Sequence, residues 1–243
     1  MTPPVVIQAG GEGARLRPYT TVLPKPLMPV GDMPILEIVV RQLVHYGFDN
    51  LYVTTGHLAH LIEAFFGDGS DWNAHITYVR EDSPLGTIGP VRRIPRPGEP
   101  LIVMNGDLLT DIDYRALYEH HLASDTLLTV AVYQGRVPVS LGVIEYNDER
   151  RIVGFREKPS LYFWASMGIY VFSPELWDLI PPDTYYGFDR LMEDILARDM
   201  VAKVFPWNGL WLDIGRPEDY ERANDEFQKH RKRLLPPRGF QDD

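Results

Sequence analysis

Apolar residues in the first 110 positions follow two patterns, which alternate along the chain. Short apolar runs predict buried strands at residues 5–9, 51–55, 75–79 and 101–105. Between them, residues 34–47 and 58–67 carry apolar positions at helical spacing, and each stretch ends at a glycine, Gly47 and Gly67. Strands that alternate with helices indicate a mostly parallel sheet covered by helices on both faces.

After about residue 110 the pattern changes to strands with few helices between them. Strands are predicted at 127–134, 141–147, 151–158, 167–173 and 201–207, with helices at 188–199 and 217–233. This order is typical of a mixed, partly antiparallel sheet extension. No repeat and no linker-like stretch divides the chain, so we expect a single domain over residues 1–243. Residues 235–243 are expected to fray.

Composition excludes several classes of function. The chain has 243 residues, 34 acidic and 24 basic, for a formal net charge of −10, which argues against a general affinity for nucleic acid or anionic lipid. It has no cysteine, no apolar stretch of the roughly 18 residues that a membrane span needs, and no basic segment typical of a secretory signal. We therefore expect a cytoplasmic protein with no membrane partner.

One glycine- and proline-rich stretch, QAGGEGARLRPYTTVLPKPLMPV at residues 8–30, departs from this acidic background. Its cations Arg15, Arg17 and Lys25 stand against Glu12 alone. Glycines let the backbone approach a ligand closely, and successive backbone N–H groups from Gly10 to Gly13 can form a nest for an anion. The stretch therefore predicts a binding site for phosphate groups.

Two common phosphate-binding motifs do not fit this stretch. The dinucleotide fingerprint G-x-G-x-x-G has Leu16 where its third glycine should be, and Pro18 opposes the helix that should begin there. A P-loop needs Gly-Lys-Ser/Thr, and this tripeptide does not occur.

The blocks AGGEGARLRPYT, PKPLMPV and PIL instead resemble the signature of sugar-1-phosphate nucleotidylyltransferases. The resemblance continues in order through PLGTIGPV (84–91), MNGD (104–107), EKP (157–159), GIYVF (168–172) and WLDIGRPEDY (211–220). It implies a Rossmann-like three-layer α/β/α nucleotidyltransferase core. It also implies transfer of a nucleotidyl group from an NTP to a sugar 1-phosphate, with residues 1–110 mainly binding the nucleotide and 111–235 mainly the sugar phosphate.

The resemblance assigns roles on the nucleotide side. Arg15 and Lys25 are expected to neutralise the triphosphate, Arg15 as a planar fork and Lys25 as a compact charge. The expected nucleotide-binding residues are Gln8, Ala9, Gly10, Gly11, Gly13, Gly86 and Thr87.

Two aspartates are implied to hold Mg²⁺. Asp107 directly follows the strand at 101–105, where ligands of an open α/β sheet bind, and Asp213 lies at the end of another apolar run. Taken alone, Asp107 is equally well explained as a turn residue after Gly106. Asp111 and Asp113 in TDID are better interpreted as the N-cap of the next helix.

On the sugar side, the resemblance implies that Lys158 holds the sugar phosphate, while Glu157, Gly142 and Ser166 line the sugar pocket. Three other features are interpreted as structural. These are the basic run at 229–233 as a solvated helix end, the pair His57 and His60 as surface or packing residues, and the aromatic run at 162–164 as core or interface.

Three positions depart from the family pattern: Ala14 replaces a hydroxyl residue, Gln8 replaces an apolar residue, and Ser166 replaces an asparagine. They leave the sugar open. The LGTIG loop favours GTP and a mannose- or heptose-type sugar 1-phosphate over thymidylyl, uridylyl or cytidylyl transfer. A catalytically silent regulatory homologue that binds nucleotide-sugars is the alternative from another class. Self-association stays open.

Overall fold

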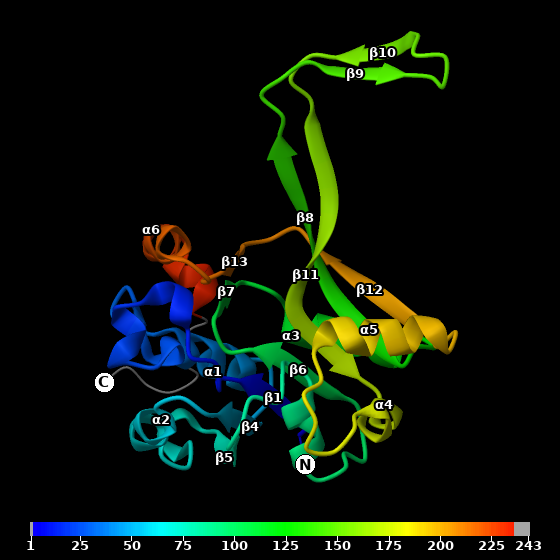
Figure 1. The fold of residues 1–243 in the computed structure, drawn as a ribbon. Helices are drawn as coiled ribbons and strands as arrows, with labels where there is room; N and C mark the ends of the chain where they lie inside the picture. Colours follow the sequence, from blue (N-terminus) through cyan, green and yellow to red (C-terminus); the bar gives the residue numbers. More distant parts are fainter. Residues whose placement is uncertain (1, 236–243) are drawn as a thin grey trace.

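The computed structural model describes residues 2–235, so the expected frayed end lies, from residue 236 on, outside the described residues. Within residues 2–235, seven strands form the main sheet in the order β12-β8-β11-β6-β1-β4-β5 (Figure 1). Their bounds are β1 (Val5–Gln8), β4 (Asn50–Thr55), β5 (His75–Arg80), β6 (Leu101–Asn105), β8 (Leu128–Pro138), β11 (Ser160–Phe172) and β12 (Ala202–Trp207). β6, β1, β4 and β5 are parallel, whereas β11 is antiparallel to both β6 and β8. The predicted mixed sheet is confirmed.

Helices cover both faces of this sheet, which explains why its central strands β1 and β6 are apolar along most of their length. Val5 and Ile7 of β1 join one buried cluster, and Val6, which points the other way, joins a second. The helices are α1 (Ile35–His45), α2 (Ala59–Phe66), α3 (Tyr114–Leu122), α4 (Pro174–Leu179), α5 (Phe188–Ala197) and α6 (Pro217–Leu234). No helix in the described part of the chain is long and apolar enough to cross a membrane.

Two short sheets and a third buried cluster attach α6 to the core. β13 (Trp211–Asp213) pairs with β7 (Leu108–Thr110), and β2 (Pro29–Val30) pairs with β3 (Met33–Pro34). Phe227 of α6 is fully buried in the third cluster. The basic run at 229–233 forms ion pairs within the chain, including Arg231 with Asp32 at 2.6 Å. Its interpretation as a structural helix end is therefore consistent with the fold.

The TDID segment is only partly an N-cap. Asp113 Oδ1 accepts a hydrogen bond from the Ala116 N–H at 2.8 Å and caps α3 as expected. Asp111 instead accepts hydrogen bonds from Trp207 Nε1 and the Leu210 N–H. It therefore ties the chain before β13 to the start of α3.

A two-stranded arm, residues 134–166, projects from the sheet (Figure 1). β12 pairs with β8 only as far as Tyr133, and β6 pairs with β11 only from Ile169, but β8 and β11 continue to pair from Ser166 opposite Val132 to Ser160 opposite Pro138. The hairpin of β9 (Val143–Tyr146) and β10 (Ile152–Arg156) forms its tip. Sequence patterning placed the start of the last long strand at residue 167, whereas β11 begins at Ser160. The aromatic run at 162–164 lies exposed on this arm, so its interpretation as core is wrong.

His121, a residue of α3, is buried against the main sheet, and its surroundings shift its pKa. Its ring nitrogens bond with the hydroxyls of Thr129 and Ser173 at 2.9 and 3.1 Å. Burial, with a smaller effect from His120, lowers the pKa of His121 from 6.5 to about 4. Between these two values the unfolded chain binds a proton that the folded protein does not, so stability is lost as the pH falls through this window.

We expect urea unfolding to show this loss directly. Between pH 7 and pH 4 the wild type should lose about 1–3 kcal/mol of unfolding free energy through His121, and His121→Gln should lose correspondingly less, whatever its stability at pH 7. His75→Gln, on an exposed position of β5, is the control and should keep the wild-type slope. An unchanged slope in His121→Gln would contradict the assignment.

Candidate functional site

The glycine loop after β1 packs tightly against the loops that follow β4 and β5. A methyl group on Gly56 would lie 2.7 Å from the Gly10 carbonyl oxygen, and one on Gly10 would lie 2.4 Å from a carboxylate oxygen of Glu81. Gly13 has φ of 61°, a left-handed conformation that favours glycine, and its carbonyl accepts a hydrogen bond from the Leu16 N–H at 2.8 Å. Glycine is therefore needed here both for close approach and for the turn.

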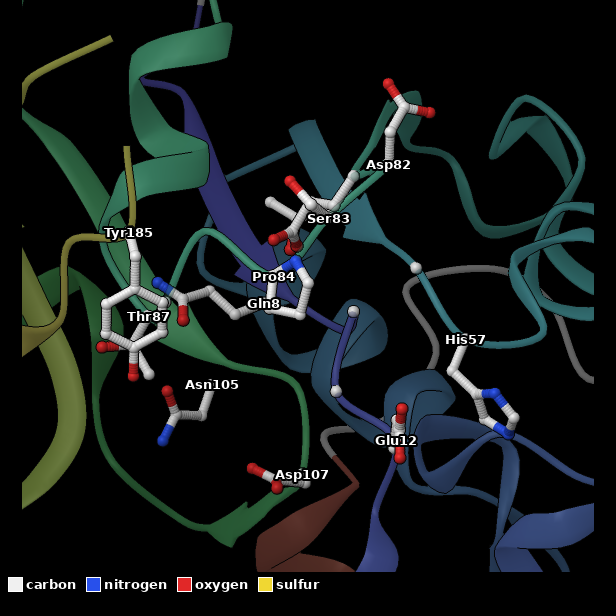
Figure 2. Close-up of a pocket in the computed structure, with 16 residues that line it drawn as sticks. Gln8, Glu12, His57, Asp82, Ser83, Pro84, Thr87, Asn105, Asp107 and Tyr185 are labelled. Atoms are coloured by element: carbon white, nitrogen blue, oxygen red, sulfur yellow. The ribbon is translucent and has the colours of Figure 1, made fainter. Parts of the chain in front are cut away.

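An open cleft of about 650 Å³ lies beside this loop, at the carboxyl ends of the parallel strands (Figure 2). Within the main sheet, the next strand along the chain after β1 is β4, which lies on one side of it, while β6 lies on its other side. The strand order therefore reverses at β1, and the cleft lies at this switch point of the sheet. The lining residues are Gln8, Gly10, Gly11, Glu12, Thr54, Gly56, His57, Glu81, Asp82, Ser83, Pro84, Gly86, Thr87, Asn105, Asp107 and Tyr185. Five of the predicted nucleotide-binding residues, Gln8, Gly10, Gly11, Gly86 and Thr87, are among them.

Gln8 points into the cleft from the end of β1. Figure 2 shows its amide directed toward Thr87 and Tyr185. Its Nε2 is buried and has no hydrogen-bond partner among the described residues. Ala9 is buried behind it, and its N–H donates to the Thr54 carbonyl at 3.0 Å. Gln8 thus offers a donor to a ligand, whereas Ala9 contributes only backbone.

The loop that carries Gly86 and Thr87 is held by the chain just before α5. Backbone N–H groups of Ile88 and Gly89 donate to the Tyr186 carbonyl, each at 2.9 Å. The Thr87 hydroxyl accepts a hydrogen bond from the Phe188 N–H at 3.0 Å. Gly86, at φ of 78°, leaves room for this contact. The same pairing positions Tyr185 at the rim of the cleft.

The predicted phosphate-neutralising cations and carboxylates come together below the cleft. Lys25 lies in a short 3₁₀ helix, is 9% exposed and forms an ion pair with Asp107. Asp213 is opposite Leu108 in the β13–β7 pair, and the Ile214 N–H donates to the Asp107 carbonyl. Arg15 reaches the same place, since a methyl group on Gly215 would lie 3.2 Å from its guanidinium. Burial and then the charge of Asp107 raise the pKa of Asp213, while Lys25 and Arg15 act against this shift.

This carboxylate pair suits a divalent cation that is completed by other oxygen ligands. Asp107 Oδ1 is buried and has no hydrogen-bond partner among the described residues. Within residues 2–235 no three histidine, aspartate or glutamate side chains are grouped as a ready metal site. A hard cation held by Asp107 and Asp213 would therefore take its remaining ligands from phosphate and water.

Three of the predicted sugar-side residues do not line the cleft of their own chain. Gly142, Glu157 and Lys158 lie at the exposed tip of the arm, near β9 and β10 (Figure 1). Ser166 lies at the base of the arm, where its hydroxyl accepts a hydrogen bond from the Gly168 N–H at 3.3 Å. Gly168 in turn lies against Asn105, because a methyl group on Gly168 would be 2.5 Å from the Asn105 amide nitrogen. The structure thus brings most of the nucleotide-side residues together, leaves Ser166 at the base of the arm outside the cleft lining, and holds the arm-tip residues away from the cleft.

Several cleft residues were not found from the sequence. Asn105 is the last residue of β6 and Glu81 directly follows β5, so the rule that ligands meet strand ends could have indicated both. Tyr185 has no sequence signal, because only its pairing with the Gly86 loop brings it to the rim. His57 also lines the cleft, where its Nε2 contacts the Thr20 carbonyl oxygen at 3.1 Å.

The chain belongs to the nucleotidyl transferase family, whose sequence model matches residues 4–230. This confirms the resemblance found in its motifs. It is 33% identical to a UTP–glucose-1-phosphate uridylyltransferase of Synechocystis over 90% of the chain and 61% of that protein. It is 31% identical to a mannose-1-phosphate guanylyltransferase of Mycobacterium tuberculosis over 90% of the chain and 63% of that protein. The chain therefore spans about 60% of the length of these relatives.

Other matches cover nearly the whole of this chain and nearly the whole of the related protein. A D-glycero-α-D-manno-heptose 1-phosphate guanylyltransferase of Aneurinibacillus thermoaerophilus is 28% identical over 93% of the chain and 98% of that protein. HddC from Yersinia pseudotuberculosis superposes with a TM-score of 0.72 at 26% identity, over 93% of the chain and 100% of HddC. The same protein complexed with GMP-PN gives a TM-score of 0.71. The fold class is thereby confirmed as the Rossmann-like nucleotidyltransferase fold.

Glu81 lines the cleft, and the shift of its pKa makes the stability of the protein depend on pH in a way that can be measured. Burial raises its pKa above the usual 4.5, although hydrogen bonds from Leu85 and Thr54 oppose this shift. Because the folded state holds this proton more tightly, the favourable contribution is present below pH 4.5 and is lost as the pH rises through the raised pKa.

Glu81→Gln should therefore have a larger free energy of unfolding than the wild type at neutral pH, with the difference shrinking as the pH falls toward 4. Asp82→Asn, the exposed neighbour on the same loop, is the control and should change stability by less than about 0.5 kcal/mol. Urea unfolding at several pH values measures both. A Glu81→Gln variant that is less stable at every pH would show that the carboxylate is needed structurally.

Proposed function

We propose that this chain transfers a nucleotidyl group from an NTP to a sugar 1-phosphate, forming an NDP-sugar and pyrophosphate. The observation that carries the proposal is the convergence of Arg15, Lys25, Asp107 and Asp213 beside a glycine loop at the switch point of the sheet. The first 110 residues would mainly bind the nucleotide and residues 111–235 mainly the sugar phosphate.

In this reaction a phosphate oxygen of the sugar 1-phosphate attacks the α-phosphorus of the NTP, and the bond to pyrophosphate breaks. Little covalent work falls to the protein, so alignment and charge neutralisation dominate. Backbone N–H groups at Gly10 and Gly11 would donate to phosphate oxygens. The Arg15 fork and the Lys25 ammonium would offset the charge that shifts toward the leaving pyrophosphate.

We propose Mg²⁺ as the cofactor, held by Asp107 and Asp213. Bound there, the ion would polarise the α-phosphate and shield the incoming negative charges from each other. Electrostatics supports this assignment. Two aspartates and two cations already balance in this cluster, so the further negative charges of the phosphates would be in excess there without another counter-ion. The free Asp107 Oδ1 is a ligand atom of the required kind.

For the base, we propose guanine, with a mannose- or heptose-type sugar 1-phosphate. Support comes from the guanylyltransferases among the relatives and from the complex of HddC with GMP-PN. Gln8, with its free amide N–H beside Thr87 and Tyr185, is a donor suited to a carbonyl oxygen on a purine. Uridylyl transfer is the second candidate, favoured by the Synechocystis relative at 33% identity.

The direct test is a matrix of NTPs against sugar 1-phosphates with pyrophosphate release as the readout. GTP with mannose or heptose 1-phosphate should give the highest kcat/KM. A protein that binds nucleotide-sugars but releases no pyrophosphate with any pair would be the silent regulatory homologue, and the proposal would be wrong.

Removing either cation should damage the chemistry more than the fold. Arg15→Ala and Lys25→Ala should each lower kcat/KM by about 10²-fold or more, equivalent to about 2.7 kcal/mol of transition-state stabilisation. Arg17→Ala is the matched control, because the Arg17 side chain is exposed and forms an ion pair with Glu12 at 3.5 Å rather than with an aspartate of the cluster. Near-wild-type rates for both Arg15→Ala and Lys25→Ala would refute their role.

If Asp107 and Asp213 bind the same Mg²⁺ ion, replacing either one should raise the Mg²⁺ concentration that activity requires. Asp107→Asn and Asp213→Asn keep the side-chain shape, so each should fold yet lose most activity and need more Mg²⁺ for the remainder. Rates are measured over a Mg²⁺ titration, with exposed Asp225→Asn of α6 as control. Full turnover in EDTA, or an unchanged Mg²⁺ response in both variants, would contradict the shared site.

A further inference from the structure

The arm exposes an unusual amount of apolar surface for a protein of this charge. Its aromatic side chains Tyr146, Phe155, Tyr162, Phe163 and Trp164 are between 48% and 69% exposed. At about 150–250 Å² for a whole aromatic side chain, these fractions leave on the order of 500 Å² in water. Exposed aliphatic side chains lie among them: Val137, Leu141, Ile144, Ile152, Val153 and Leu161. A standard interface takes about 800 Å² from each partner, so the arm alone carries an interface-sized patch.

A ribbon of two strands cannot bury this surface by itself. The β8–β11 register puts Tyr162 and Trp164 on one face, and Leu161 and Phe163 on the other. Phe163 covers Gly135, where a methyl group would lie 2.5 Å from the ring, but the outer side of that ring stays in water. Two-stranded ribbons are marginally stable in water without a packing partner. Both faces of the arm therefore need a cover that the described chain does not provide.

The arm tip also carries a small polar cluster that has no ligand of its own. Gly142 lies against Glu157, such that a methyl group on Gly142 would be 3.3 Å from a Glu157 carboxylate oxygen. Lys158 has φ of 43°, a left-handed conformation that lysine rarely adopts. The Val139 N–H donates to the Pro159 carbonyl at 2.8 Å and fixes the chain on which Lys158 lies. Lys158 therefore lies at the far end of the arm, on a segment that a backbone hydrogen bond ties to the neighbouring strand.

The cleft, in contrast, lacks a cation on its open side. Within the described residues its lining includes the carboxylates of Glu12, Glu81, Asp82 and Asp107 but no lysine or arginine. Lys25 is buried beside Asp107, and the exposed Arg15 lies beside Gly215, outside the cleft lining. A second phosphorylated substrate that entered from the open side would therefore meet no positive side chain there.

The arm of the same chain is held away from this cleft. From Val132 to Pro138 the paired strand advances about 20 Å beyond the sheet, at about 3.3 Å for each residue. The ladder with β11 is continuous over this stretch, and Arg136 Nε donates to the Ser160 hydroxyl at 2.8 Å. Folding the tip back onto its own cleft would break this ladder.

We propose that two copies of this chain pair through their arms, and that the arm tip of each copy supplies Lys158 and Glu157 to the open side of the partner's cleft. This inference rests on the proposed function, because Lys158 would hold the phosphate of the sugar 1-phosphate there. A second copy fits better than an unrelated partner, since every chain has both an unoccupied arm tip and a cleft without an outer cation. One two-fold operation satisfies both and covers the aromatic faces.

The decisive experiment is complementation between two inactive variants of the full chain. Lys25→Ala removes the deep cation and Lys158→Ala removes the arm cation. The two chains are co-expressed with different affinity tags, and mixed dimers are isolated over both tags. Each mixed dimer contains one site with an intact core and an intact partner arm, so about half of the wild-type rate should return. If each arm serves its own chain, no site is complete and the mixed dimer stays as inactive as its parents, which would overturn the proposal.

A second measurement is independent of activity. Sedimentation at micromolar concentration should give a dimer for the wild type and a monomer for the double variant Phe163→Ser, Trp164→Ser, with unchanged circular dichroism. Leu122→Ser, which changes an exposed apolar residue of α3, is the control and should stay dimeric. A monomeric wild type, or a double variant that stays dimeric, would overturn the proposal. If the wild type dimerises through the arm but turns over no substrate pair, the proposed function fails while the association stands.

Discussion

The pairing of β1 between β4 and β6 is the constraint on which the rest of the site depends. Because these strands are parallel, their carboxyl ends lie along one edge, and the chain segments that follow them meet there. The glycine loop, the loop at Gly56 and the Asn105–Asp107 turn are all such segments. Their contact is so close that side chains at Gly10, Gly56 or Gly106 would overlap neighbouring atoms. The sheet therefore fixes both the position of the cleft and the residues that its floor tolerates.

The cluster of Arg15, Lys25, Asp107 and Asp213 has balanced charges, but within the described residues one of its carboxylate oxygens has no hydrogen-bond partner. Lys25 pairs with one oxygen of Asp107, and the other has no hydrogen-bond partner among residues 2–235. Partial desolvation and then the charge of Asp107 raise the pKa of Asp213. Such groups cost folding free energy unless something else interacts with them. A protein that binds phosphates and a divalent cation recovers this cost only when its ligands are present. The unsatisfied atoms thus point to the chemistry that the glycine loop also indicates.

The arm is a part of the main sheet that extends beyond the core. β8 and β11 leave the core at the edge where the cleft opens, and they remain paired after both have lost their other neighbours. A sheet that continues beyond its helices loses the cover that its apolar side chains require. The aromatic residues on both faces of the arm are therefore exposed in the single chain, and this exposure is why we propose a second copy as their cover.

Sequence patterns were sufficient to predict the α/β class, most element positions and the residues of the glycine loop. Periodicity and glycine placement are local properties, and β6 at Leu101–Asn105 agrees with its predicted range residue for residue. Family motifs likewise identified Arg15, Lys25, Asp107 and Asp213 one by one. That these four residues lie together and that Tyr185 joins the cleft depends on tertiary contacts, because strand order and the contact at Tyr186 link segments far apart in the chain. The tertiary structure also excluded the core for residues 162–164, which lie exposed on the arm, and left their interpretation as an interface open. The apolar pattern of a strand is the same whether its cover comes from its own helices or from another chain, so no sequence pattern could have made that distinction.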